Sequence, residues 1–281
     1  MATTIFKIVQ KFSGIIPPRI RYKLALVYYK FDRLIKYGTT DFPIAVEVET
    51  TTACNRRCSW CPNSKFDRGL IKNEKKLSSE LFYKIIDELH DLDFNGRFSP
   101  HLFGEPLFDK RMLNFMKYTR MKLPKANIVI FTNGDYLNEA EYKKYAEIGI
   151  DAFNLTQYDK DLSQRLKELI KKIDVGEICG PKINLKIINE NTAVCNRGGL
   201  VEHPKICSVP KCAMPSENLN INYKGDIIIC SSDYFGVAHF GNVSKERLID
   251  VWKKKKFSTL RKEIKKGVYN LDICKKCDSR C

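Results

Sequence analysis

The sequence predicts an α/β fold in which strands and helices alternate along most of the chain, with a small hairpin-and-helix region after them. From Pro43 to about Lys186, β-branched strand patterns alternate with amphipathic helical patterns. Strands joined by helical crossovers form a parallel sheet. The chain has 281 residues with a hydrophobic fraction of 43%. This is enough for one barrel of about 200 residues plus a small appendage.

The first 42 residues contain two amphipathic helical patterns, at Ile5 to Phe12 and Ile20 to Ile35, separated by a proline pair. Charged residues interrupt both patterns, and no run of about 20 apolar residues predicts a transmembrane helix. A signal peptide is not expected either, because no uncharged apolar segment precedes a small-residue cleavage site. We expect a helical collar packed on the barrel, with a weak membrane-surface contact through these basic helices as the alternative.

Five strands and four connecting helices are expected next. The predicted strands are Ile44 to Thr50, Phe98 to Phe103, Asn127 to Thr132, Ala152 to Thr156 and Ile183 to Ile188. The predicted helices lie near Ser78 to His90, Lys110 to Met121, Glu139 to Ile148 and Leu162 to Ile173. In such folds, ligands bind where the parallel strands end at their carboxyl side. The residues that follow each strand are therefore the candidates for a functional site.

Three cysteines follow the first strand at the spacing C-x3-C-x2-C, namely Cys54, Cys58 and Cys61. Three thiolates on one short loop can converge on one metal centre. Structural zinc is usually closed by four ligands, and a [4Fe-4S] cluster also has four irons to bind. Three local cysteines therefore leave one position open for a small-molecule ligand. The alternative is a zinc site completed by a distant Cys or His.

The segment from Cys54 to Cys61, with Trp60 before its last cysteine, resembles the cluster loop of the radical S-adenosylmethionine (SAM) superfamily, whose pattern is C-x3-C-x-aromatic-C. The resemblance implies a partial (β/α)6 barrel and a [4Fe-4S] cluster whose open iron is chelated by SAM. It also implies reductive cleavage of SAM to methionine and a 5′-deoxyadenosyl radical, which abstracts hydrogen from the substrate. An external electron donor such as flavodoxin or ferredoxin is then expected.

Residues at the ends of later strands resemble the SAM-binding segments of this superfamily. Gly104 and Glu105 lie in a segment similar to the family's G-G-E-P, with Phe103 in place of the first glycine. The remaining cofactor-binding candidates that the resemblance implies are Trp60, Thr132, Asn133, Thr156 and Gln157. His101, in the same segment as Glu105, could face the barrel interior, but we favour a packed structural role.

An arginine follows the fifth strand in the segment Asn196-Arg197-Gly198-Gly199. The glycines permit close backbone approach, and the guanidinium is a planar, permanent cation. In relatives with an auxiliary cluster, an arginine-bearing segment at this place faces the substrate between the two cofactors. Arg197 is therefore the catalytic candidate, with a solvated surface arginine as the alternative.

The C-terminal region contains a second set of cysteines. The stretch Tyr223 to Asp226 predicts the turn of a β-hairpin, and a helical pattern with Leu248, Val251, Trp252 and Leu260 follows it. Two separate cysteines and a C-x2-C pair can supply four thiolates to one site, from Cys212, Cys230, Cys274 and Cys277. On ligand count alone, zinc would also satisfy that site.

The spacing of these cysteines resembles the SPASM and Twitch domains of radical SAM enzymes, which bind auxiliary [4Fe-4S] clusters. The chain stops soon after the pair, which favours the shorter Twitch form with one cluster, and Cys207 and Cys281 are candidate alternate ligands. The expected fold is a partial radical SAM barrel with a small Twitch/SPASM-like domain. We expect an N-terminal helical segment at residues 1–42, the barrel at 43–205 and the auxiliary cluster domain at 206–281.

Charge and cysteine content bear on the compartment and on possible partners. Eleven cysteines without an apparent secretory peptide favour a reducing, cytoplasmic compartment and metal sites over disulfides. The formal charge of +16 could attract phosphate, so a basic iron-sulfur or zinc protein that binds RNA is an alternative. Lysines spread through amphipathic helices, such as Lys84, Lys143 and Lys171, also fit a solvated surface.

A fully ligated auxiliary cluster has no open iron for substrate, so its simplest use is to accept or donate one electron. Hydrogen abstraction from a carbinol carbon leaves a ketyl-type radical, which becomes strongly reducing when it loses a proton. Passing its electron to the auxiliary cluster would complete the oxidation of a secondary alcohol to a ketone. We therefore predict an oxidoreductase acting on a cyclitol or aminosugar-like small molecule. The alternative is a maturase of a ribosomal peptide, although residues 1–42 are short for a leader-binding domain.

Overall fold

The computed structural model describes residues 18–158, 161–188, 192, 194–202 and 211–277. Its contacts divide the chain into residues 1–44 and residues 45–281. The predicted helix Ile5 to Phe12 and the candidate ligands Cys207 and Cys281 lie outside the described residues.

Helix α2 (Pro18–Tyr37) confirms the second of the predicted N-terminal helices. A stripe of large apolar side chains at helical spacing is exposed along it, formed by Ile20, Leu24, Val27, Phe31 and Leu34. Both the collar and the membrane-surface contact stay predictions. In the described part of the chain, no helix combines the length and apolar character that crossing a membrane requires.

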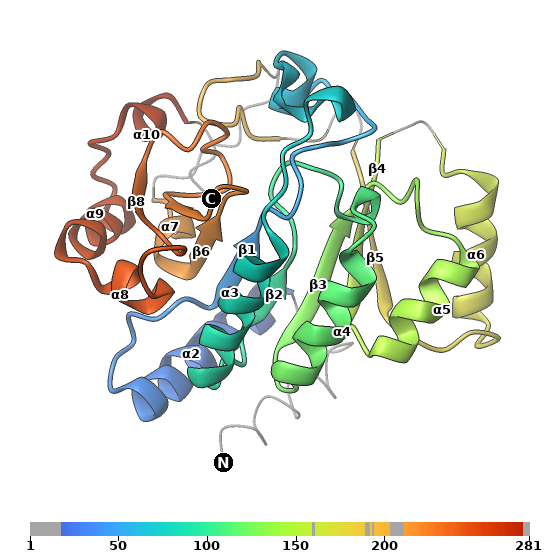
Figure 1. Ribbon diagram of the computed structural model, residues 1–281, viewed down its shortest axis with the longest axis horizontal. Helices are drawn as coiled ribbons and strands as arrows, with labels where there is room; N and C mark the ends of the chain where they lie inside the picture. The colour runs from blue at the N-terminus through green and yellow to red at the C-terminus, as the bar shows by residue number, and fades with distance from the viewer. Residues whose placement is uncertain (1–17, 159–160, 189–191, 193, 203–210, 278–281) are drawn as a thin grey trace. The chain divides into compact units, whose positions relative to one another are not determined.

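Residues 45–281 are organised around one eight-stranded sheet with the order β5-β4-β3-β2-β1-β6-β7-β8 (Figure 1). The first five strands are β1 (Ala45–Val48), β2 (Arg97–Ser99), β3 (Asn127–Thr132), β4 (Ala152–Gln157) and β5 (Lys182–Ile187). Neighbours among these five strands pair in parallel. They correspond to the five predicted strands, so the parallel α/β architecture is confirmed.

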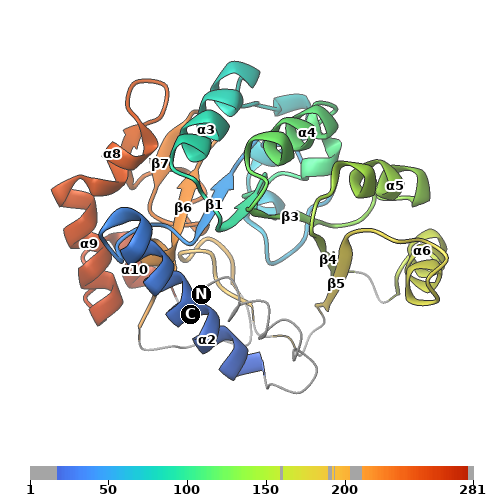
Figure 2. The same cartoon turned by 90° about the horizontal axis from the view of Figure 1, so that it is seen from below.

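The helices that connect these strands form an arc outside them (Figure 2). They are α3 (Ser79–Asp91), α4 (Met112–Lys122), α5 (Glu139–Ile148) and α6 (Gln164–Asp174). Side chains of Ser78, Asn138 and Ser163 cap three of them by accepting backbone N–H groups. The buried faces pack closely, as in the stack of Phe82 on Phe115 with ring centroids 4.0 Å apart. The inner face of the strands is left to line the site.

The C-terminal region adds further strands to the same sheet. Strand β6 (Asn218–Ile221) pairs in parallel with β1, with Ala45 opposite Asn218 and Val48 opposite Ile221. Strand β7 (Asp226–Ile228) is antiparallel to β6, which confirms the predicted hairpin. Strand β8 (His239–Asn242), which we did not expect from the sequence, pairs with β7. The hairpin therefore continues the barrel sheet.

Short helices complete the fold. Four 3-10 turns lie at Pro62–Ser64, Asp67–Gly69, Ile71–Asn73 and Pro106–Phe108. The C-terminal helices are α7 (Met214–Glu217), α8 (Leu248–Lys253), α9 (Lys255–Lys266) and α10 (Asp272–Lys276). The single helical pattern predicted around Trp252 is thus two helices, because Lys254 adopts φ −51° and ψ 130°, outside the helical region.

Candidate active site and cluster sites

The loop after β1 brings its three cysteines to one cavity. Cys54, Cys58 and Cys61 all line a cavity of about 590 Å³. Backbone hydrogen bonds hold the loop, because Cys54 N–H donates to the Gly69 carbonyl at 3.0 Å and Cys61 N–H donates to the Cys58 carbonyl at 2.9 Å. The backbone N–H of Arg56 donates to Cys54 Sγ at 3.4 Å. Such a donor favours the thiolate form that a metal requires.

Burial disfavours the thiolate form of two of these cysteines. It raises the pKa of Cys54 to about 11, and it raises the pKa of Cys61 above its ordinary value. A buried thiol ionises readily when a cation bonds to it, because the cation compensates the lost hydration. Three half-buried thiols that share one cavity are a donor set that fits a [4Fe-4S] cluster with one open iron.

Glu105 joins the end of β2 to the end of β3. Its Oε1 accepts from Thr132 Oγ1 at 2.6 Å, and its Oε2 accepts from the Asn133 N–H at 2.9 Å. Burial raises the pKa of Glu105 to about 7. A positively charged amino group beside this carboxyl would favour the ionised form. The site therefore fits a ligand that carries an ammonium group, as SAM does.

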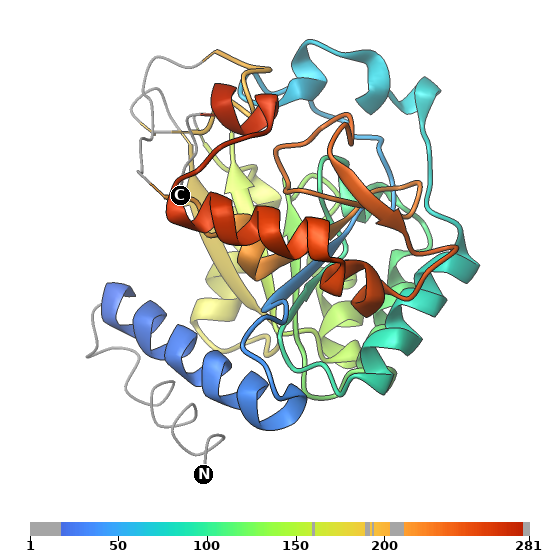
Figure 3. The same cartoon turned by 90° about the vertical axis from the view of Figure 1, so that its left-hand side faces the viewer.

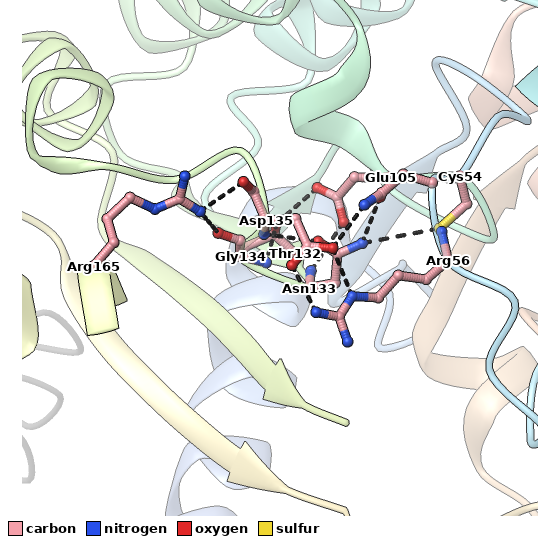
Figure 4. A network of polar contacts seen from close by, with 9 residues as sticks. Cys54, Arg56, Glu105, Thr132, Asn133, Gly134, Asp135 and Arg165 are labelled. Atoms are coloured by element: carbon pink, nitrogen blue, oxygen red, sulfur yellow. Dashed lines mark hydrogen bonds and ion pairs between the residues drawn. The ribbon is translucent and has the colours of Figure 1, made fainter. Parts of the chain in front are cut away.

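A polar network links the turn after β3 to the cysteine loop (Figure 4). Asp135 receives two hydrogen bonds from Arg56, through Nε and Nη2, each 2.6 Å long. Asn133 Nδ2 donates to Asn55 Oδ1 at 2.9 Å and lies 4.0 Å from Cys54 Sγ. Sequence reasoning missed the Arg56–Asp135 pair, since neither position is specified by the cysteine pattern. The network keeps the predicted residues Asn133 and Cys54 together.

Gly104 occupies a place where the backbone leaves no room for a side chain. A Cβ atom at this position would lie 2.1 Å from the Thr51 carbonyl oxygen. Its neighbour Phe103, which replaces a family glycine, packs instead into an apolar cluster with Leu102, Ile228 and Tyr234. This apolar cluster accommodates Phe103 at the position where the family has a glycine. Gly104 and Glu105 still line the cavity.

Most of the other predicted cofactor-binding residues also reach the cavity. Trp60, Thr132, Asn133 and Thr156 line it, and the Trp60 ring stacks on Tyr158 with centroids 5.6 Å apart. Thr156 and Tyr158 line the cavity, whereas Gln157 between them does not and is 9% exposed. Tyr158 was not singled out from the sequence.

The four cysteines predicted for the C-terminal site line a second cavity of about 190 Å³. They are Cys212, Cys230, Cys274 and Cys277. Apolar side chains such as Ile264 and Ile273 enclose it. Burial raises the pKa values of Cys212 and Cys230, and it raises that of Cys274 to about 12. Four thiols around one apolar cavity are a donor set that fits a fully ligated [4Fe-4S] cluster.

Two protein-family models match the segments of the chain that contain the two sets of cysteines. A radical SAM superfamily model matches residues 48–178, and a model of the SPASM iron-sulfur cluster-binding domain matches residues 212–278. The S-adenosyl-L-methionine-dependent 2-deoxy-scyllo-inosamine dehydrogenase of Niallia circulans is 30% identical over 239 residues, covering 83% of this chain and 92% of that protein. The chain belongs to the radical SAM superfamily. A GTP 3′,8-cyclase of Nautilia profundicola is 26% identical, over 56% of this chain and 47% of that protein.

Solved structures confirm the predicted fold of this radical SAM protein. The crystal structure of BtrN in complex with AdoMet and 2-DOIA matches with a TM-score of 0.73 and 29% identity, covering 84% of this chain and 93% of that one. The structure of anSMEcpe with bound AdoMet, at 12% identity and a TM-score of 0.57, shows the fold alone; it covers 85% of this chain and 90% of that one.

These matches confirm the predicted class, a radical SAM oxidoreductase that uses SAM and two [4Fe-4S] clusters. They support an enzyme over the RNA-binding alternative. Which residues bind each cofactor stays a prediction, as do the domain boundaries.

In this radical SAM enzyme, Arg197 lies where the two cavities meet. Arg197 and Cys195 are residues that line both cavities. Arg197 has φ +51°, which is uncommon for a residue other than glycine. Burial by itself lowers the pKa of Arg197. Nearby ionisable groups raise that pKa by more, so it lies above its ordinary value; the groups are those of Cys195, Cys61, Tyr158 and Cys230. Sequence reasoning missed Cys195, although it stands only two residues before Arg197.

His101 also lies on the wall of the larger cavity. Its ring stacks on Phe131 with centroids 5.7 Å apart. Burial, together with the charges of Arg197 and Arg97, lowers the pKa of His101 to about 3. The ring is therefore packed as we expected from the sequence, but it also faces the site as a neutral imidazole.

Proposed function

We propose that this enzyme oxidises a secondary alcohol of a cyclitol or aminosugar-like substrate to a ketone. The observation that carries the proposal is the position of Arg197, which lines both the cavity of the SAM-binding loop and the cavity of the C-terminal cysteines. A substrate held at Arg197 would be next to both cofactors. The similarity to a dehydrogenase of an aminocyclitol over most of both chains supports the same reaction class.

Residues of the two cavities would hold the two clusters and bind SAM. Cys54, Cys58 and Cys61 would hold the first cluster, and the four cysteines of the second cavity would hold the other. When bound, these cofactors supply a hydrogen-abstracting radical on one side of the substrate and a one-electron acceptor on the other. Glu105 would bind the ammonium group of SAM, because its buried carboxyl lacks a cationic partner among the contacts it makes with Thr132, Asn133 and Leu107.

Oxidation of an alcohol to a ketone removes two electrons and two protons from the substrate. Hydrogen abstraction at carbon takes one electron and one proton, so one of each remains. A cluster held by the four cysteines of the second cavity would have to accept the remaining electron, and the hydroxyl proton would leave to a base or to water. Arg197 would donate hydrogen bonds to the substrate oxygen and stabilise its negative charge as that proton leaves.

The test is anaerobic turnover of the reconstituted enzyme with SAM, a reductant and a panel of aminocyclitols, cyclitols and aminosugars that includes 2-deoxy-scyllo-inosamine. We expect equal amounts of 5′-deoxyadenosine, methionine and ketone from at least one of them. Cys54→Ala should abolish 5′-deoxyadenosine formation, whereas Cys230→Ala should keep some SAM cleavage and lose the ketone. Equal SAM cleavage by wild type and Cys54→Ala would overturn the assignment, and an isomerised product without net oxidation would replace dehydrogenation by epimerisation.

Reductive cleavage of SAM consumes one electron per event, so we also expect an external one-electron donor of the flavodoxin or ferredoxin type. A cytoplasmic location and weak membrane-surface contact through α2 stay predictions.

A further inference from the structure

A basic surface covers the outside of the C-terminal region. Between residues 253 and 276, eight lysines are exposed, namely Lys253, Lys255, Lys256, Lys262, Lys265, Lys266, Lys275 and Lys276. Asp272 is the exposed carboxylate in the same stretch, and Lys275 pairs with it at 3.4 Å. Among the residues that the structure describes, the other seven of these lysines form no ion pair. Uncompensated charge of one sign therefore gathers here.

Three lysines of α9 lie on its outer side. Phe257, Leu260 and Ile264 are buried on the inner side of that helix. Lys255, Lys262 and Lys266 recur at i, i+7 and i+11, which places them along one line on the opposite side. Figure 3 shows α9, in red-orange, on the outside of residues 45–281 and toward the viewer. We call these three residues the α9 lysine face.

The same helices form a wall of the four-cysteine cavity. Ile264 of α9 and Ile273 of α10 line that cavity from the inside. Ile273 also lines a groove of about 760 Å³ on the outer surface, together with Lys255 and Lys256. Val237, which is 71% exposed, adds an apolar contact to this groove. A protein seated there would be separated from the cysteines by about the 10 Å width of one helix.

We propose that the α9 lysine face and its groove are the docking site of an acidic one-electron carrier protein. The inference rests on the proposed function. In that reaction one electron enters with each SAM cleavage and one electron leaves the substrate for the four-cysteine site. That electron must leave before the next turnover, so the oxidised carrier accepts it and becomes reduced by one electron.

The surface fits such a carrier better than a nucleic acid or a lipid headgroup. Weak electron-transfer complexes are small, and protein interfaces combine an apolar centre with a polar rim. Here Val237 and Ile273 provide the apolar part, Lys255 and Lys256 line the groove beside them, and Lys262 and Lys266 continue the positive charge along the exposed side of α9. Complementary charge speeds encounter with an acidic partner.

The first test measures the dissociation constant of the reconstituted holoenzyme for an acidic flavodoxin by titration calorimetry, at low and high salt. The variant Lys255→Glu/Lys262→Glu/Lys266→Glu reverses the α9 lysine face. The control Lys110→Glu/Lys117→Glu/Lys171→Glu changes the net charge equally, at exposed lysines near or on α4 and α6. We expect a dissociation constant about tenfold higher for the α9 variant and within about twofold of wild type for the control.

The second test measures electron transfer without SAM chemistry. In a Cys54→Ala/Cys58→Ala/Cys61→Ala background, stopped-flow absorbance would follow one-electron exchange between flavodoxin and the C-terminal site. The α9 variant should slow this exchange about tenfold at low salt, and the control should not.

Equal weakening by both variants would overturn the proposal, because it would reflect net charge alone. No weakening by the α9 variant would place the docking site elsewhere. A third outcome would also overturn the proposal. If wild type does not bind flavodoxin, and the α9 variant binds phosphatidylglycerol vesicles or an RNA oligonucleotide more weakly than wild type does, the surface belongs to a phosphate-bearing partner instead. Neither test uses an alcohol substrate. If flavodoxin binds as expected but the enzyme oxidises no alcohol, only the proposed function is overturned.

Discussion

Glu105 illustrates how one buried carboxyl couples ligand binding to stability. Its pKa is raised by burial from 4.5 to about 7. The folded protein therefore binds the proton of Glu105 more tightly than the unfolded chain does. This contribution to stability is fully present below about pH 4.5 and is lost as the pH rises through about 7.

The prediction at Glu105 compares wild type with Glu105→Gln, whose side chain stays neutral. Between pH 4.5 and pH 8, the free energy of unfolding of wild type should fall by about 3 kcal/mol relative to the variant. Urea unfolding of the protein at a series of pH values measures this difference. Parallel pH profiles for the two proteins would contradict it.

Arg197 is the second residue with a distinct expectation. Arg197→Gln removes the cation and the planar donor fork, so we expect ketone formation to fall about 100-fold while SAM cleavage falls much less. The ratio of ketone to 5′-deoxyadenosine measures this uncoupling. Arg247→Gln, at an exposed arginine 4.0 Å from Asp91, is the matched control. An equal loss of both products in Arg197→Gln would point to a structural role.

At the scale of elements, the segment after β2 is positioned by direct backbone contact with the loop after β1. The Glu105 N–H donates to the Ala53 carbonyl at 2.8 Å, and Gly104 lies against Thr51. The hydrogen bonds of Glu105 then hold the end of β3. Two strand ends and the cysteine loop thus depend on one glycine.

Gly104→Ala should therefore impair SAM binding. The new methyl group would overlap the Thr51 carbonyl oxygen, from which an ideal Cβ lies 2.1 Å away. We expect the dissociation constant for SAM, measured by equilibrium dialysis, to rise at least about tenfold. Gly176→Ala is the control, since its Cβ meets open space and only its left-handed φ of +77° costs about 1 kcal/mol. Similar SAM affinity in both variants would contradict the close-approach argument.

The elements themselves follow from local patterns. The helices around Phe82 and Tyr142 and the strands around Val46 and Ile130 are signalled by periodicity and capping residues. The break at Lys254 between α8 and α9 could not be predicted, because the apolar spacing runs on across it. Strand β8 was missed because it is short and contains a glycine, which weakens the strand signal.

For the whole molecule, two separate thiol sites predict a simple metal count. Anaerobic reconstitution should give about eight irons per chain. Replacing either the three cysteines of the first loop or the four of the second cavity by alanine should leave about four. Iron and zinc analysis of the purified proteins measures this. Zinc at the second site, or about four irons in the wild type, would contradict the role of that site as an electron acceptor.

The sequence by itself determined the two sets of cysteines, the order of the first five strands and their four connecting helices, and the turn of the β6–β7 hairpin. These depend on spacing and periodicity over a few neighbouring residues, which a single chain displays directly. The resemblance of the first cysteine loop to a known family also needs no folded structure.

Only the tertiary structure decided that β6 lies beside β1, that Arg56 pairs with Asp135, and that Arg197 and Cys195 line both cavities. Each of these contacts joins segments far apart in the chain. Local patterns carry no information about such partners, because the partners are chosen by how the packed elements close on one another. The basic face of α9 next to the four-cysteine cavity arises for the same reason.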